Sequence, residues 1–250
     1  MMLDARAMAE AYYGHFHDSL GSSTQAVDLA LKYGSLNDAT GYNDNLALRE
    51  AEVGNLTVAR HLANKSLGMV QSTDRRPILA LALAQAGEVD QAQRLVDQIN
   101  YDAPSDTLVQ NYTLPSIRAA LKLQTSDPAA AIEILRSTVK YDLASPIGFG
   151  SLYPAYIRGR AYLELREGRL AAGEFQKLLD HPGMVGRSVT GALSLLQMAR
   201  AQKLLGERTA ALKSYEDFLA LWKTADSDLP VYQQAKAEYA ELRKNYQPAN

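Results

Sequence analysis

The hydrophobic and polar positions of this chain predict helices from one end to the other. Amphipathic stretches, each with apolar side chains at helical spacing on one face, alternate with short segments that contain glycine, proline or serine. Most of these helices fall in pairs joined by a tight turn, and a last helix has no partner. The predicted pairs are 3–18 with 22–33, 42–53 with 55–70, 75–86 with 88–100, 106–124 with 127–139, 151–167 with 169–180, and 188–205 with 207–223, followed by the single helix 229–246.

A small residue recurs at one place in each predicted pair, five residues after the turn. The alanines are separated by 33, 33, 39, 40 and 40 residues, and they are Ala26, Ala59, Ala92, Ala131, Ala171 and Ala211. The turn residues before them are Gly21, Gly54, Gly87, Ser126, Arg166 and Gly206. Two antiparallel helices joined by a short turn approach closely, so a larger side chain at their crossing would hold them apart. A fixed period of this size predicts stacked helical hairpins.

The same register resembles the tetratricopeptide (TPR) repeat. The small residue at its position 8 appears as Gly14, Ala47, Ala80, Ala119, Gly159 and Ala199. The fifth repeat is the closest match, with Gly159, Tyr162, Ala171, Phe175 and Pro182 near the consensus places, although Pro182 comes one residue early. The large aromatic residue of position 4 is missing from all six repeats.

The TPR resemblance implies an all-α fold, an α-solenoid of about six hairpins with a C-terminal capping helix. Residues 1–250 would form a single superhelical domain. Its repeats would span about 3–33, 42–70, 75–100, 106–139, 151–180 and 188–223, and helix 229–246 would cover the end of the stack. The longer connections at 140–151 and 181–188 are candidates for functional surface.

Residues 40–245 also resemble a narrower group, the C-terminal TPR region of bacterial serine/threonine protein kinases of the acidobacterial type. The strings YTLPSIRAALKLQTSDPAAAIEIL, LYPAYIRGRAYLELREGRLAAGEFQKLLDHPG and SYEDFLALWKTADSDLPVYQQAKAEYAEL carry this resemblance. Similar regions follow winged-helix regulators. The chain has no glycine-rich phosphate loop, HRD or DFG motif, so no kinase activity is expected of it. The resemblance implies the sensor or docking part of a signalling protein.

Composition narrows the expected partners. A net charge of −2 gives no overall attraction to nucleic acid or to an anionic membrane surface. Without cysteine, the chain has no disulfide, thiolate metal site or cysteine nucleophile. No apolar run approaches the length of a membrane span, which predicts no direct membrane insertion. The sequence is compatible with a location in the cytoplasm or, if the chain comes from a membrane-anchored kinase, in the periplasm.

Candidate catalytic and metal-binding groups are few. His15 and His17 lie two residues apart on one predicted helix, so their side chains would point to different faces and make a poor metal pair. No serine, histidine and acid form a recognisable motif, and no phosphate loop or EF-hand is present. The sequence therefore predicts a chain that is not an enzyme and needs no metal or cofactor.

The TPR resemblance implies a partner-binding groove lined by the first helix of each hairpin. In the last two hairpins it contains Tyr153, Tyr156, Arg160, Leu163, Leu196, Arg200 and Lys203. Arg160 and Arg200 would occupy the same place in adjacent repeats, where they could hold an acidic side chain or chain terminus of a partner. The alternative is that each arginine pairs with an acid such as Glu164 or lies flat over apolar surface. Arg118 and Arg158 occupy a half-buried position, which favours a structural role.

The sequence is compatible with two functions of different classes. One is a non-catalytic protein–protein interaction module that binds a protein or peptide segment in the groove. The other is a structural role in which exposed apolar surface, at the N-terminal end or on the last helix, packs against a second copy as a homodimer. A chaperone-tail clamp is disfavoured because Ala11 and His15 replace its lysine and asparagine. Nothing in the sequence favours small-molecule sensing.

Overall fold

The computed structural model describes residues 2–69, 72–73, 75–144, 150 and 152–244, and this part of the chain is helical with no strand. The expectation of an all-α fold is therefore confirmed. The helices are α1 (Met2–Tyr12), α2 (Phe16–Lys32), α3 (Leu36–Glu52), α4 (Leu56–Leu67), α5 (Arg76–Gln85), α6 (Val89–Asp102), the π-helical turn η1 (Val109–Thr113), α7 (Leu114–Gln124), α8 (Pro128–Ile134), the 3₁₀ helix η2 (Leu135–Tyr141), α9 (Tyr153–Glu164), α10 (Gly168–Asp180), α11 (Pro182–Val185), α12 (Val189–Leu204), α13 (Arg208–Leu221) and α14 (Pro230–Lys244).

One turn geometry recurs between successive helices. After α5, Gly87 adopts φ +82°; its N–H donates to the carbonyl of Ala84, and the N–H of Glu88 donates to the carbonyl of Leu83. These two bonds form a Schellman motif, which ends a helix with one residue in the left-handed conformation. The same conformation ends the preceding helix at Gly14, Gly34, Gly54, Ser126, Arg166 and Gly206. Five of the six predicted turn residues are thus confirmed.

The exception lies in the first hairpin, where the prediction of a helix over 3–18 and a turn at Gly21 was wrong. Gly21 lies inside α2, and the left-handed residues are Gly14 and Gly34 instead. A glycine that ends a helix adopts positive φ, whereas a glycine inside a helix has ordinary helical φ. The sequence alone does not distinguish the two. As a consequence α1, α2 and α3 follow one another through two similar turns, and α3 begins at Leu36 rather than near residue 42.

The recurring small residue lies where the helices meet. Each of Ala59, Ala92, Ala131, Ala171 and Ala211 is fully buried. In the first two turns, Ser19 and Ala39 are the buried residues five positions after Gly14 and Gly34. The approach is equally close at Gly159 on α9, where an added Cβ would come within 2.6 Å of the Phe175 ring on α10. Small side chains therefore set the spacing of these helix pairs.

Arg166 is strained by its place in the recurring turn, and Arg166→Gly should stabilise the protein. A side chain with a Cβ is disfavoured at φ +60°, and Arg166 is exposed. Removing the Cβ should raise the free energy of unfolding by about 1 kcal/mol. Urea denaturation measures this. As the reverse control, Gly206→Ala places a Cβ at φ +75° with no atom within 4 Å, and it should lose about the same amount. Equal stability of R166G and the unmodified chain would contradict the prediction.

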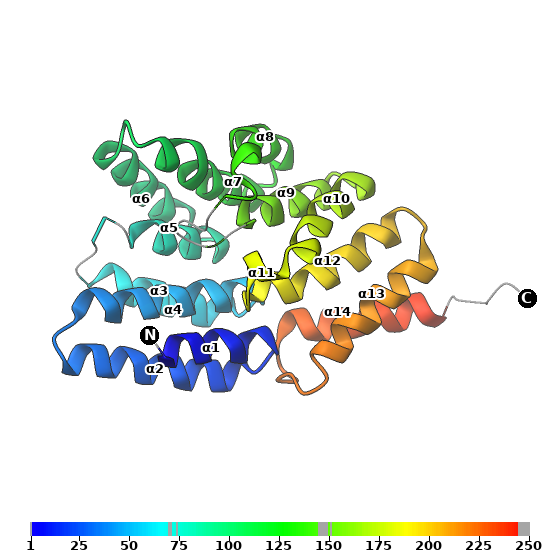
Figure 1. The fold of residues 1–250 in the computed structure, drawn as a ribbon, viewed down its shortest axis with the longest axis horizontal. Helices are drawn as coiled ribbons and strands as arrows, with labels where there is room; N and C mark the ends of the chain where they lie inside the picture. Colours follow the sequence, from blue (N-terminus) through cyan, green and yellow to red (C-terminus); the bar gives the residue numbers. More distant parts are fainter. Residues whose placement is uncertain (1, 70–71, 74, 145–149, 151, 245–250) are drawn as a thin grey trace, which may run out of the picture.

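The two ends of the described chain pack against each other, as Figure 1 shows for α1 and α2 beside α13 and α14. Trp222, at the end of α13, is fully buried, and its indole N–H donates to the carbonyl of Tyr12 at 3.0 Å. Phe16 on α2 packs against the same indole, with ring centroids 6.3 Å apart. Apolar burial of these aromatic side chains holds the first hairpin on the last one.

Polar contacts reinforce the same junction. The backbone N–H of Asp226 donates to the carbonyl of Gly14, and its carboxylate accepts from the backbone N–H of His17. The His17 ring also lies 3.2 Å from Asp228, and the ring of His15 lies 2.9 Å from the Thr224 hydroxyl. The prediction that His15 and His17 lie on one helix was therefore wrong. The turn at Gly14 ends α1, and His15 precedes the first residue of α2, Phe16.

The start of the last helix, α14, contacts the end of α3. Helix α14 agrees with the expected 229–246, whose final residues 245–246 lie outside the described part of the chain. The backbone N–H of Val231 donates to the carbonyl of Val53, which follows α3, at 3.2 Å. Half of the predicted 140–151 connection, residues 145–149 and 151, lies outside the described residues, whereas 181–188 contains α11. No helix in the described part of the chain is both long and apolar enough to cross a membrane.

Candidate functional site

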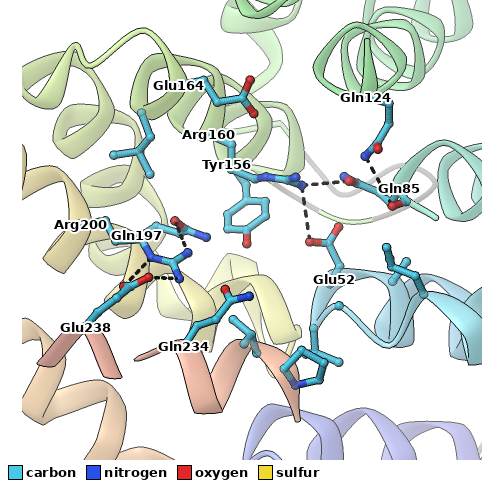
Figure 2. Close-up of a pocket in the computed structure, with 17 residues that line it drawn as sticks. Glu52, Gln85, Gln124, Tyr156, Arg160, Glu164, Gln197, Arg200, Gln234 and Glu238 are labelled. Atoms are coloured by element: carbon cyan, nitrogen blue, oxygen red, sulfur yellow. Dashed lines mark hydrogen bonds and ion pairs between the residues drawn. The ribbon is translucent and has the colours of Figure 1, made fainter. Parts of the chain in front are cut away.

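A cavity of about 600 Å³ lies among the ends of α3, α5, α7, α9, α12 and α14 (Figure 2). It exists because α14 is held against the end of α3, so residues from both halves of the sequence face one space. The wall is mixed. Its residues are Ala51, Glu52, Val53, Gly54, Leu56, Gln85, Gln124, Tyr156, Arg160, Leu163, Glu164, Gln197, Arg200, Pro230, Val231, Gln234 and Glu238.

Arg200 is neutralised on one side of this cavity. Its Nε and Nη2 donate to the two carboxylate oxygens of Glu238, both at 2.9 Å, in the bidentate geometry that suits a guanidinium. Its Nη1 also donates to the amide oxygen of Gln197 at 3.3 Å. Tyr215 donates a hydrogen bond to Glu238 at 2.9 Å and so fixes the carboxylate. This guanidinium has a carboxylate of its own chain where the anion of a partner was expected.

Arg160 is held more loosely across the cavity. Its Nη1 donates to the amide oxygen of Gln85 at 2.9 Å and lies 4.0 Å from Oε2 of Glu52 (Figure 2). About a quarter of its side chain is exposed. The alternative interpretation of both arginines, that each pairs with an acid, therefore holds, but the acids are Glu52 and Glu238 rather than Glu164. Both partners come from helices distant in the sequence.

Glu52 is the most buried acid in the wall of this cavity. Its side chain is 2% exposed, and Oε1 accepts a hydrogen bond from the Tyr153 hydroxyl. Oε2 is buried and has no hydrogen-bond partner among the described residues. Burial raises the pKa of the Glu52 carboxyl, and the charge of Arg160 and the Tyr153 hydrogen bond offset that rise in part. The orphan oxygen is an acceptor without a donor.

The structure sorts the predicted groove residues into three groups. Tyr156, Arg160, Leu163 and Arg200 line the cavity together, as the groove prediction required. Leu196 does not line it, because its side chain is fully buried in the apolar core.

The remaining two predicted residues lie beside the cavity. Tyr153 is 2% exposed, packs in the core and lines a second cavity of about 360 Å³ on the α1 side of Glu52. Lys203 lies outside both cavities, and its ammonium group is 3.5 Å from Glu241 on α14. Four of the seven predicted residues thus line one cavity, and their role in binding a partner stays a prediction.

Sequence reasoning missed Glu52, Gln85 and Gln124, which come from the earlier helices, although a signal that they share with Glu164 exists. Glu52, Gln85, Gln124 and Glu164 each stand two residues before the left-handed turn residue of their hairpin, and all four line the cavity. The shared turn aims this position of successive hairpins at one space. A polar side chain repeated two positions before the turn would have identified the site.

The comparisons with known proteins identify no family for this chain. No model of a known protein family matches it, and no curated protein matches it. Within the described residues, no group of three histidine, aspartate or glutamate side chains could hold a metal ion. The donors and acceptors around the cavity therefore indicate what it can bind.

Proposed function

We propose that the chain is a TPR-like helical repeat protein whose central cavity binds a segment of a partner protein. The observation that carries this proposal is the recurrence of one polar position, two residues before the turn, at Glu52, Gln85, Gln124 and Glu164 on successive hairpins. Stacked repeats place equivalent positions in a row, and an extended chain can run along such a row.

The chemistry of the wall suits a polypeptide. Gln85, Gln124, Gln197 and Gln234 carry N–H donors and carbonyl acceptors, the same pair of groups that each peptide unit presents, and the oxygens of Gln85 and Gln197 already accept from Arg160 and Arg200. Apolar side chains between them, such as Leu56 and Leu163, suit the side chains of a bound segment. The cavity volume of about 600 Å³ lies within the range of ligand-binding sites in proteins.

The wider role proposed, the sensor or docking region of a bacterial signalling protein, rests on the sequence resemblance to kinase-associated repeats. The alternative, self-association through the N-terminal end or the last helix, is less favoured. Within one chain the N-terminal end already contacts Trp222 and Asp226, which precede the last helix, and the start of that helix contacts Val53. A second copy would have to compete with these intramolecular contacts.

Leu163→Trp should block binding without unfolding the chain. Leu163 lines the cavity and is half-buried, so an indole there would occupy the space of the partner segment. We expect recovery of the partner by affinity capture from lysate of the source organism, quantified by mass spectrometry, to fall at least about tenfold. The matched control is Leu165→Trp, two residues along, which is 40% exposed and outside the cavity wall.

Thermal melting of both variants separates a blocked site from a damaged fold. Both should melt near the temperature of the unmodified chain, since neither position is in a fully buried core. Partners recovered equally by L163W and L165W would contradict a role for the cavity. Recovery of only the chain itself would favour the self-association alternative.

A further inference from the structure

The charges of the cavity do not match an acidic partner. Among the described residues of its wall, Glu52, Glu164 and Glu238 are acidic and Arg160 and Arg200 are basic, which leaves a formal charge of −1. Arg200 already has a bidentate carboxylate, and Arg160 has Gln85 and the nearby Glu52. An incoming carboxylate would have to displace these contacts and add to a negative site.

One group in the wall lacks a donor. Oε2 of Glu52 is buried and without a hydrogen-bond partner among the described residues, and the nearest cation, Arg160 Nη1, is 4.0 Å away, beyond hydrogen-bond length. A buried carboxylate oxygen without a donor is costly, so a ligand that supplies a donor there gains the full difference. Figure 2 shows Glu52 extending from the end of α3 toward Arg160 and Gln85.

We infer, on the basis of the proposed function, that the cavity receives a lysine side chain of the partner segment, whose ammonium group donates to Oε2 of Glu52. A lysine joins a long apolar stem to a compact charge. The stem would lie along the apolar wall, which includes Val53, Leu56 and Val231. Glu164, one helical turn along α9 from Arg160, adds a second negative charge at the rim.

The acceptor geometry favours lysine over arginine. A guanidinium binds a carboxylate best through both oxygens, and Oε1 of Glu52 is already occupied by the Tyr153 hydroxyl. An ammonium group needs one oxygen of the carboxylate and can direct its other donors to neighbouring amide oxygens. Gln234, on α14, lines the same cavity and carries such an oxygen.

The test uses capped tripeptides as probes on the unmodified chain. The probes are Ac-Ala-Lys-Ala-NH₂, its Gln, Glu and Arg counterparts, and H-Ala-Gln-Ala-NH₂, which carries a free amino terminus. Binding is followed by NMR through the side-chain amide signals of the cavity glutamines Gln85, Gln124, Gln197 and Gln234. We expect the lysine peptide to shift these signals and to bind at least about tenfold more tightly than the glutamine peptide.

Two variants locate the lysine contact. Glu52→Gln keeps an acceptor for Tyr153 but removes the charge, and it should lower the affinity for the lysine peptide about tenfold. Glu133→Gln removes an exposed acid on α8 that pairs with Arg136 and is not part of the cavity wall, and it should leave the affinity unchanged. Thermal melting checks that both variants are folded.

Each other outcome overturns the inference in a way that the proposed function can survive. Preference for the glutamate or arginine peptide would replace lysine by that side chain in the same cavity. Equal affinity for H-Ala-Gln-Ala-NH₂ would assign the site to a chain amino terminus. An unchanged affinity in E52Q would remove Glu52 from recognition. If no probe moves the glutamine signals, the lysine site is wrong, while the L163W capture experiment still decides the proposed function separately.

Discussion

The stability of Asp44→Asn relative to the unmodified chain is expected to increase by roughly 4 kcal/mol between about pH 4 and about pH 8, an unusually large change for one substitution. Asp44 lies on α3 and is 0% exposed. Burial raises the pKa of its carboxyl to about 7, and Ser66 and Arg75 offset that rise only in part. At neutral pH and above, the folded protein must therefore hold a costly buried charge, which an asparagine lacks.

The sign of the pH dependence follows from this raised pKa. In acid, below the unfolded pKa near 3.8, both folded and unfolded chains carry the proton and the penalty is absent. As the pH rises toward about 7, the unfolded chain loses the proton while the folded chain keeps it, so stability falls by about 1.4 kcal/mol per pH unit. Above about 7 both states are ionised and the penalty is complete.

Urea denaturation at several pH values between about 4 and 8 tests the prediction. The advantage of D44N should be small at the acid end and grow until it levels off near neutrality. The control is Asp28→Asn on α2, which removes an exposed carboxylate of the same type and should show no such growth. A D44N advantage that is equal at every pH would mean that side-chain packing, rather than the buried charge, is its cause.

The parts of the fold that the sequence predicts are those set by local chemistry. The turns at Gly54, Gly87 and Gly206 follow from residues that tolerate the left-handed conformation, and Asp127 caps α8 by accepting the backbone N–H of Ala130. Gly21 shows the limit of this reasoning. A glycine is also compatible with a helix interior, so composition alone could not decide between Gly14 and Gly21 as the end of the first helix.

The candidate site depends on contacts between distant parts of the chain, which a repeat pattern does not contain. A repeat register relates each hairpin to its neighbour. The contacts of Trp222 with Tyr12 and of Val231 with Val53 instead join residues that are far apart in the sequence. These contacts bring Glu52 and Glu238 to the two arginines. The register therefore predicted where Arg160 and Arg200 lie and could not predict the acids that neutralise them.

Arg158→Met is expected to lower the free energy of unfolding by about 3 kcal/mol, because it leaves two carboxylates without their main cation. Arg158 on α9 has a side chain that is 3% exposed, and its Nη2 donates to Asp142 at 2.5 Å and to Glu174 at 2.8 Å. Its Nη1 donates to the Thr138 hydroxyl at 2.8 Å. Although burial disfavours the charge, Glu174 and Asp142 raise the pKa of Arg158. This network confirms the structural role expected of Arg158.

A second variant identifies the cause of the loss. If the uncompensated carboxylate of Asp142 is responsible, R158M/D142N should recover part of the stability that R158M loses, since the double variant has one buried charge fewer. Lys177 lies 3.1 Å from Asp142 and 3.0 Å from Glu174, which keeps the expected loss at the lower end of the range for a broken buried pair.

The matched control is an exposed ion pair between an arginine and a glutamate. Arg136→Met removes a cation that lies 3.0 Å from Glu133, with both side chains more than 60% exposed, and it should cost less than about 1 kcal/mol. Urea denaturation of all three variants under one set of conditions makes the comparison. Equal losses in R158M and R136M would show that the buried network adds no stability. A further loss in R158M/D142N would show that Asp142 is stabilised by Lys177 once the arginine is gone.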